Sequence, residues 1–131
     1  MALKKTLLDL ANEVRAEGSV EEIDVEEFGE LMNEEDGMLI VDVREPDEFV
    51  RGHVKGAVNL PRGVIEMRLE KECFGGNASE ADLWRPVVLY CGGGHRSILA
   101  GKMLREQGFE RVYSLEGGMS AYGEADLEIE I

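Results

Sequence analysis

A cysteine followed by three glycines, a histidine and an arginine lies between an apolar segment and a helical one. The segment Val87–Tyr90 has the composition of a buried strand, and Cys91 follows it directly. Residues 97–107 are predicted to form a helix that ends at Gly108. A thiol at such a junction faces the free amides of the first helical turn and the positive end of the helix dipole. The thiolate of Cys91 should therefore be stabilised, which favours nucleophilic sulfur chemistry.

The glycines of this turn leave room for its amides to bind an anion. Because Gly92, Gly93 and Gly94 have no Cβ, successive N–H groups can curl inward around a negative charge. That charge would be the thiolate, a terminal persulfide sulfur or an oxyanion of a bound substrate. The alternative is a small buried cysteine before a flexible turn, the commoner role of a free cysteine. The order of strand, thiol, glycines, cation and helix start favours the reactive interpretation.

The polar side chains that close the loop each have two interpretations. Arg96 either clamps the oxygens of a substrate or forms a structural ion pair at the start of the helix. His95 either points away from the converging amides, which the geometry of such a turn favours, or acts at the mouth as a gate or base. Ser97 completes the loop. Together with Cys91 and the glycines, these residues form the candidate site.

The elements that position this loop alternate between strand and helix patterns. Strands are expected up to Ile23 and at residues 39–43, 57–60, 87–90 and 111–114. Helices are expected before Gly18, at residues 24–32, 46–50, 64–70 and 97–107, and after Gly117–Gly118. Each connection is long enough to return the chain to the same edge of the sheet. The pattern predicts an α/β fold with a parallel sheet of about five strands, helices on both faces, and Cys91 at the carboxyl edge.

The chain is long enough for one domain with short segments at its ends. Residues 1–18 are expected to form a helix that packs on the domain through Leu3, Leu7, Leu10 and Val14. Residues 19–124 form the domain itself. In the tail, residues 125–131, apolar and acidic residues alternate, so the tail either adds a strand to a sheet edge, in this chain or a neighbour, or frays.

Charge and cysteine usage limit the classes of partner and cofactor. Acidic residues outnumber basic ones 28 to 14, for a formal charge of −14. This charge disfavours nucleic acid and anionic membranes, and it is compatible with a basic protein partner or a salty habitat. Two cysteines and two histidines show no zinc spacing, so no metal site is expected. The first residues resemble neither a secretion signal nor a membrane span, which predicts a cytoplasmic protein.

Two further expectations concern the segment before the central strand. A loop that rests over the site is predicted from Cys73 to Trp84, because this stretch is rich in glycine, asparagine and serine. Cys73 is either an ordinary semi-buried thiol or a resolving partner for Cys91.

The large aromatic side chains are expected in the core, namely Trp84, Phe28, Phe49, Phe109 and Tyr113.

Three motifs in order resemble the rhodanese sulfurtransferases. They are VDVREPDEFVRGHVKGAVNLP at residues 41–61, YCGGGHRS at residues 90–97 and VYSLEGGMSAY at residues 112–122. The first motif holds four charged or polar residues, for which a structural role is expected, because such groups beside core segments pair with each other or with backbone: Asp42, Arg44, Glu48 and His53. The resemblance covers nearly all of residues 19–124 and identifies the chain as similar to a single-domain member.

The resemblance implies a sulfur-transfer reaction. The Cys91 thiolate would attack the sulfane sulfur of a donor, a small anion such as thiosulfate or a protein persulfide. It would then pass that sulfur to cyanide or to a thiol acceptor. No metal or organic cofactor is implied. Many members have a basic residue just after the cysteine, where this chain has Gly92 and Gly93. Arg62, just beyond residues 57–60, is the candidate for supplying the missing positive charge.

Three other functions remain open at this point. Cell-cycle dual-specificity phosphatases have a similar fold, but their loop has five residues between cysteine and arginine, whereas four separate Cys91 from Arg96. A rhodanese scaffold can also serve as a non-catalytic protein-binding module. Thiol-dependent arsenate reduction would need a resolving thiol, for which Cys73 is the only candidate.

Overall fold

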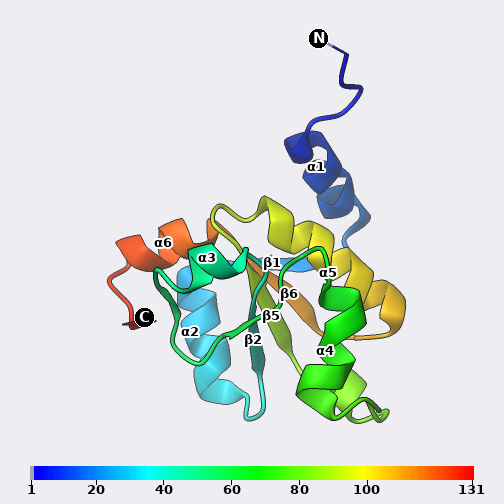
Figure 1. The fold of residues 1–131 in the computed structure, drawn as a ribbon, viewed down its shortest axis with the longest axis vertical. Coiled ribbons are helices and arrows are strands. Elements are labelled where there is room, and N and C mark those ends of the chain that lie inside the picture. The colour runs from blue at the N-terminus through cyan, green and yellow to red at the C-terminus, as the bar shows by residue number, and fades with distance from the viewer. Residues whose placement is uncertain (1) are drawn as a thin grey trace.

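A five-stranded parallel sheet forms the centre of the computed structural model, which describes residues 2–131 (Figure 1). The strands, in their order across the sheet, are β1 (Glu21–Ile23), β6 (Val112–Leu115), β5 (Val87–Tyr90), β2 (Leu39–Asp42) and β4 (Val58–Asn59). Every neighbouring pair is parallel. The fold class predicted from the sequence is therefore confirmed.

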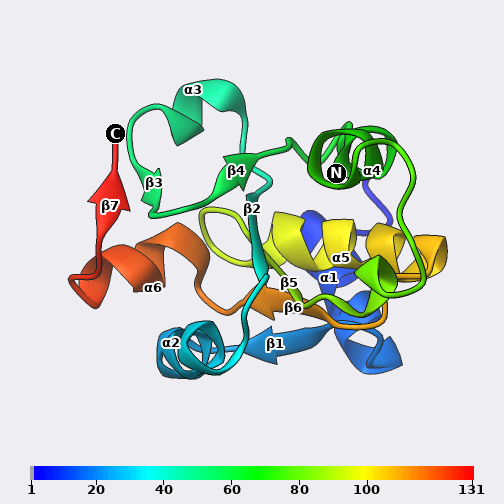
Figure 2. The ribbon, with the colours of Figure 1, turned by 90° about the horizontal axis from the view of Figure 1, so that it is seen from below.

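Helices cover both faces of the sheet (Figure 2). On one face lie α4 (Ile65–Phe74) and α5 (His95–Gln107), and on the other lie α2 (Val25–Glu34) and α6 (Gly118–Glu124). The short helix α3 (Pro46–Phe49) follows β2 and begins with the predicted proline. Asp24 caps α2 by accepting from the amide of Glu27, as the sequence pattern predicts.

The central strand β5 is buried on both sides, which explains its unbroken apolar sequence. Val87 and Leu89 pack into the core under α4 and α5, whereas Val88 and Tyr90 pack into the core under α2 and α6. All four side chains are fully buried. Successive strand residues point to opposite faces of the sheet. Cys91, which directly follows β5, therefore packs on the same side as Val87 and Leu89, the side that α5 covers.

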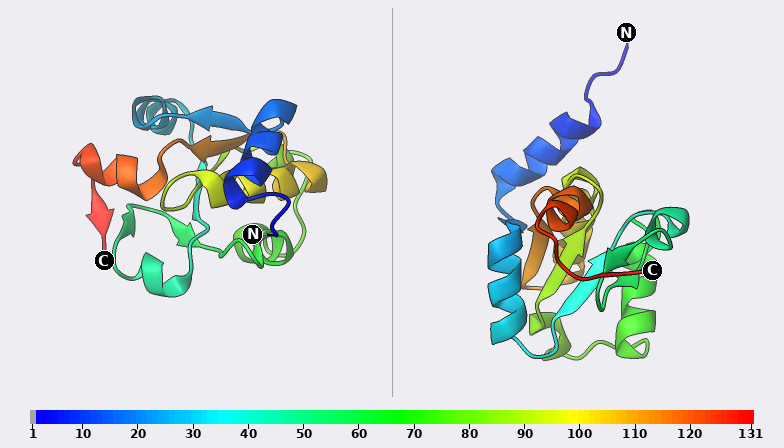
Figure 3. Two further views of the ribbon diagram at one scale, coloured as in Figure 1. Left: turned by 90° about the horizontal axis from the view of Figure 1, so that it is seen from above. Right: turned by 90° about the vertical axis from the view of Figure 1, so that its left-hand side faces the viewer.

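The N-terminal helix α1 (Leu7–Glu17) packs on α5, but of the expected apolar stripe it buries Val14 and not the leucines. Ala11 and Val14 are buried in the core, whereas Leu3, Leu7 and Leu10 are 68%, 44% and 42% exposed. Thr6 caps the helix, so Leu3 precedes it and cannot share its apolar stripe. Figure 3 shows the described residues before α1, from Ala2 on, running away from the body of the molecule.

The C-terminal tail forms a strand within this chain. β7 (Ile129–Glu130) pairs antiparallel with β3 (His53–Val54), with His53 opposite Glu130. Figure 2 shows this two-stranded sheet beside the main one. Sequence reasoning left the tail open between pairing and fraying, and it did not foresee β3 inside the first motif.

The segment from Cys73 to Trp84, which is predicted to rest over the site, lies instead at the opposite end of the strands, their amino ends. α4 extends to Phe74, which places Cys73 on a helix, and a 3-10 helix covers Asp82–Trp84. The amide of Glu110, shortly before β6, donates to the carbonyl of Leu83, shortly before β5. This segment therefore lies at the amino ends of both strands. Trp84 is 60% exposed, so its predicted core position is wrong.

The other aromatic predictions fare better. Phe28 and Phe109 are buried, and Phe49 and Tyr113 are partly buried.

The helices within residues 2–131 all fall short of the length and apolar character that crossing a membrane requires.

Candidate active site

Cys91 lies at the carboxyl end of β5, with its sulfur inside the turn that starts α5. The amide of Gly94 donates to Cys91 Sγ at 3.1 Å, and Ser97 Oγ lies 3.5 Å from the same sulfur. The residue is only 1% exposed. The resting site therefore holds its sulfur against hydrogen-bonding groups and shields it from water.

The polarity of the turn outweighs its burial. Burial raises the pKa of the Cys91 thiol, but hydrogen bonds from the side chain and amide of Ser97 lower it, as do the amides of Gly94 and Gly93. The net effect places the thiol pKa below its ordinary value. A lowered pKa increases the fraction of nucleophilic thiolate near neutral pH.

A buried pair of serines supports the sulfur from the side of the sheet. Ser97 Oγ lies 2.8 Å from Ser114 Oγ, and both side chains are fully buried. Ser97 can thus donate to the sulfur while it accepts from Ser114. Sequence reasoning missed Ser114, although a serine within the otherwise large and apolar side chains of β6 was a signal for it.

The amino end of α6 holds the carbonyls of the turn. Met119 N–H donates to the Cys91 carbonyl at 2.7 Å, and Ser120 N–H donates to the Gly92 carbonyl at 3.1 Å. This close approach requires glycine at position 118, where a Cβ would come within 2.3 Å of the Cys91 carbonyl oxygen. Anchoring the carbonyls outward leaves the amides free to face the sulfur.

Arg96 forms an ion pair with Glu48 of α3. Its Nη1 and Nη2 lie 2.9 and 3.1 Å from the two carboxylate oxygens. The hydrogen bonds from Arg96 lower the pKa of Glu48 to about 2, despite partial burial. The proximity of the Cys91 sulfur, after that of Glu48, contributes to a raised pKa of Arg96. Of the two interpretations of Arg96, the resting structure shows the ion pair.

The charged residues of the first motif bind one another and the backbone. Arg44 Nη2 lies 2.7 Å from Asp42 Oδ2 and donates to the Gly52 carbonyl at 2.7 Å. Asn59 donates to the carbonyls of Asp42 and Arg44, which ties β4 to this segment. Asp42 is completely buried and Arg44 nearly so. These contacts hold α3, and therefore Glu48, at the edge of the sheet where Cys91 lies.

His53 contacts Phe49 of α3 and Glu130 of β7. Its Nδ1 lies 3.0 Å from the carbonyl oxygen of Phe49, and its ring stacks on that of Phe49 with centroids 3.7 Å apart. Its Nε2 lies 3.7 Å from a carboxylate oxygen of Glu130 in the tail. The ring thus links α3 to β7.

The structure places His95 against α1 and Arg62 at the carboxyl edge of the sheet. His95 Nδ1 is 3.1 Å from Nη2 of Arg15, so the ring contacts α1. Arg62 is exposed, and its amide donates to the Val43 carbonyl at 3.0 Å just beyond β2. Within residues 2–131 its side chain forms no ion pair. The structure thus brings Arg62 to the expected edge, where no hydrogen bond among the described residues joins its side chain to the loop.

Cys73 is partly buried on α4, and both cysteines are free. Burial raises the pKa of the Cys73 thiol, with a further contribution from the negative charge of Glu72. A thiol in that environment stays protonated near neutrality. The two cysteines therefore have opposite chemical character.

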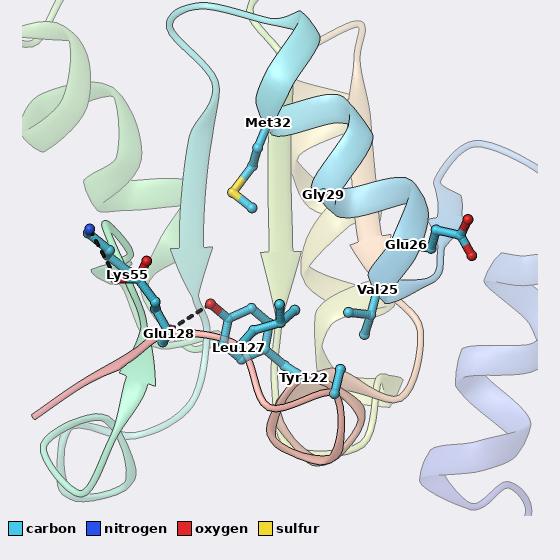
Figure 4. Close-up of a pocket in the computed structure, with 9 residues that line it drawn as sticks. Val25, Glu26, Gly29, Met32, Lys55, Tyr122, Leu127 and Glu128 are labelled. Carbon is cyan, nitrogen blue, oxygen red and sulfur yellow. Dashed lines mark hydrogen bonds and ion pairs between the residues drawn. The ribbon is translucent and has the colours of Figure 1, made fainter.

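Two hollows are relevant to function, one next to the candidate site and the other farther from it. One, of about 340 Å³, borders the Arg96–Glu48 pair and is lined by Arg44, Glu48, Arg51, Gly52, Met119 and Ile129. The larger, of about 580 Å³, lies between α2, α6 and the tail, where Val25 and Met32 lie opposite Tyr122 and Leu127 (Figure 4). Of these two hollows, the smaller includes residues that bond to the Cys91 loop, namely Glu48 and Met119.

Comparisons with known proteins agree on one family. A family model described as Rhodanese-like domain matches residues 24–125. A sulfurtransferase of Allochromatium vinosum is 36% identical over 110 residues, which cover 84% of this chain and 94% of that protein. The thiosulfate sulfurtransferase of Shewanella oneidensis is 40% identical over 95 residues, which cover 72% and 85%.

One solved structure resembles almost the whole chain. It is a protein of unknown function from Rhodopseudomonas palustris, described as a possible tyrosine phosphatase. The TM-score is 0.80 at 27% identity, and the match covers 99% of this chain and 98% of that one. The likeness therefore includes the segments at both ends that lie outside the family match.

Proposed function

This chain belongs to the rhodanese-like domain family, and we propose that it transfers sulfane sulfur from a donor to an acceptor through a persulfide on Cys91. The relatives support sulfur transfer of the rhodanese type in general. The persulfide route is supported by one observation above all, the convergence of the Gly94 amide and the Ser97 hydroxyl on Cys91 Sγ.

The proposed reaction has two displacements at sulfur. The Cys91 thiolate attacks the outer sulfur of thiosulfate, the S–S bond of the donor breaks, and sulfite leaves with the electron pair. The terminal sulfur of the resulting persulfide is then attacked by an acceptor thiolate or by cyanide. That step forms an acceptor persulfide or thiocyanate and returns Cys91 as a thiolate.

The turn suits both anionic states of the cycle. The hydrogen bonds that stabilise the thiolate can stabilise the equally negative terminal sulfur of the persulfide. Because Cys91 is nearly buried, the donor must approach through a local opening of the loop. No metal or organic cofactor takes part in the proposed steps.

The donor is proposed to be thiosulfate or a protein persulfide. Long-range attraction of small anions is weak, because the chain carries a formal charge of −14 and Arg96 is paired with Glu48. An acidic protein of this kind also fits a basic protein as donor or acceptor. Comparing thiosulfate, mercaptopyruvate and a protein persulfide with the same acceptors would identify the donor.

The decisive experiment is the intact mass of the protein after exposure to thiosulfate. We expect the mass to rise by one sulfur atom and to return when cyanide or a thiol is added. Cys91→Ser should abolish the gain, whereas the matched variant Cys73→Ser should retain it. An unchanged mass with every donor, or a gain that follows Cys73, would refute the proposal.

One alternative has an observation in its favour. The Rhodopseudomonas palustris structure is described as a possible tyrosine phosphatase, and in this chain Arg96 lies close to Cys91. However, Arg96 is paired with Glu48, and the loop has one residue fewer than the phosphatase spacing. Cys91-dependent hydrolysis of an aryl phosphate, without a mass gain from sulfur donors, would reverse the ranking.

Two further alternatives receive less support. Arsenate reduction would require a second reactive thiol, and the pKa of Cys73 is raised by burial. A non-catalytic docking role would leave partner binding unaffected by Cys91→Ser.

A further inference from the structure

The helix α1 reaches the active-site turn through one side chain. Arg15 lies in the last turn of α1, three residues before its cap at Gly18 and outside the segment that matches the family model. Its Nη2 lies 3.1 Å from His95 Nδ1 and makes a longer contact of 3.5 Å with the Gly94 carbonyl. A residue from a peripheral helix thus contacts the junction between the loop and α5.

The other donors of Arg15 hold its guanidinium in one orientation. Nε donates to Glu22 at 2.9 Å, and Nη1 donates to Asn12 at 2.8 Å. The side chain is only 25% exposed. A planar guanidinium with three separately bonded nitrogens has little freedom to rotate. Nη2 is therefore presented to the turn in a defined position.

The residues that Arg15 contacts are the ones that shape the sulfur site. Gly94 has a φ of 99°, caps the amino end of α5 and donates its amide to Cys91 Sγ. Because a guanidinium can only donate, the contact with His95 requires its Nδ1 to be unprotonated and turns the ring toward α1. Loss of Arg15 would free the His95 ring and would remove the contact with the Gly94 carbonyl.

We propose that Arg15 is a positioning residue, which keeps the turn from Gly94 to His95 in the conformation that aims the Gly94 amide at Cys91. This inference rests on the proposed role of Cys91 and extends it to a helix that the family match does not include. It also assigns His95 a place in the support of the loop, in contact with α1.

The test compares Arg15→Met with Lys102→Met in a Cys73→Ser background. Lys102 on α5 bonds to Glu17 of α1 at 3.0 Å, so its loss removes an ion pair between the same two helices without touching the turn. Thiolate absorbance in the ultraviolet, followed against pH, reports the ionisation of the single remaining thiol. Sulfur-transfer kinetics and thermal unfolding are measured on the same variants.

We expect Arg15→Met to shift the ionisation of Cys91 to higher pH and to lower kcat about fivefold, with little change in KM for the donor. Lys102→Met should leave the ionisation unchanged even where it lowers the unfolding temperature. Unchanged ionisation in Arg15→Met, or an equal shift in both variants, would overturn the proposal. If the parent protein transferred no sulfur, the titration would still decide the role of Arg15.

Discussion

The guanidinium of Arg96 is bound by the carboxylate of Glu48, which lies 48 residues earlier in the chain. Both groups are partly buried at the edge of the Cys91 loop. The pair neutralises the one cation of the loop in the resting protein and fixes its position.

Replacing Glu48 by glutamine should lower stability by an amount that varies with pH in a defined window. The folded-state pKa of Glu48 is about 2, against an ordinary value of 4.5, so its ionised form stabilises the folded state. The loss of unfolding free energy in Glu48→Gln should be complete above about pH 4.5 and should shrink as pH falls toward 2. Chemical unfolding at a series of pH values measures this. Asp47→Asn on the same helix serves as control, and a loss that does not vary with pH would contradict the role of the pair.

Replacing Ser97 by alanine should weaken the thiolate. The variant removes a hydroxyl that bonds to Cys91 Sγ, so the thiol pKa should rise and persulfide formation should slow by about tenfold near neutral pH. The deficit should diminish at higher pH, where the thiol ionises in both proteins. Ser114→Ala, which acts only through Ser97, should show a smaller effect. Stopped-flow rates across pH test this, and superimposable profiles would count against it.

Replacing Gly118 by alanine should displace the loop. The new Cβ would collide with the Cys91 and Gly92 carbonyls, and the φ of 53° is strained for alanine. We expect a loss of about 2 kcal/mol or more in stability together with severely reduced transfer. Gly123→Ala, on the same helix with open space around it, should be neutral or stabilising by up to about 1 kcal/mol. Urea unfolding of both variants distinguishes the two sites, and equal effects would refute the steric argument.

Replacing Asp42 by alanine should be far costlier than replacing Asp47. Asp42 is fully buried against Arg44, so its loss leaves an unpaired guanidinium in the interior, at a cost of about 3 to 5 kcal/mol. The Asp47–Arg51 pair is largely exposed, and Asp47→Ala should change stability by no more than about 0.5 kcal/mol. Denaturant midpoints measure both. A small loss in Asp42→Ala would show that Arg44 finds another partner or water.

Much of the fold follows from short-range patterns in the sequence. The apolar run of Val87–Tyr90, the capping box at Asp24 and the glycine after α5 each specify a local conformation from a few adjacent residues. The alternation of these elements then leaves a parallel sheet as the arrangement that buries them. The position of Cys91 between β5 and α5 required no knowledge of the rest of the chain.

The tertiary structure alone decided which distant groups meet. The pairing of Arg96 with Glu48, the support of Ser97 by Ser114 and the contact between Arg15 and His95 join residues from different elements. Trp84 and the tail illustrate the same point. Whether an aromatic side chain is buried, and which strand the tail pairs with, depends on segments that are distant in the sequence. Local periodicity and capping act over a few residues, whereas a side chain's partner depends on how helices and strands cross in space. The sequence therefore determined where the thiol lies along the fold, and packing determined what surrounds it.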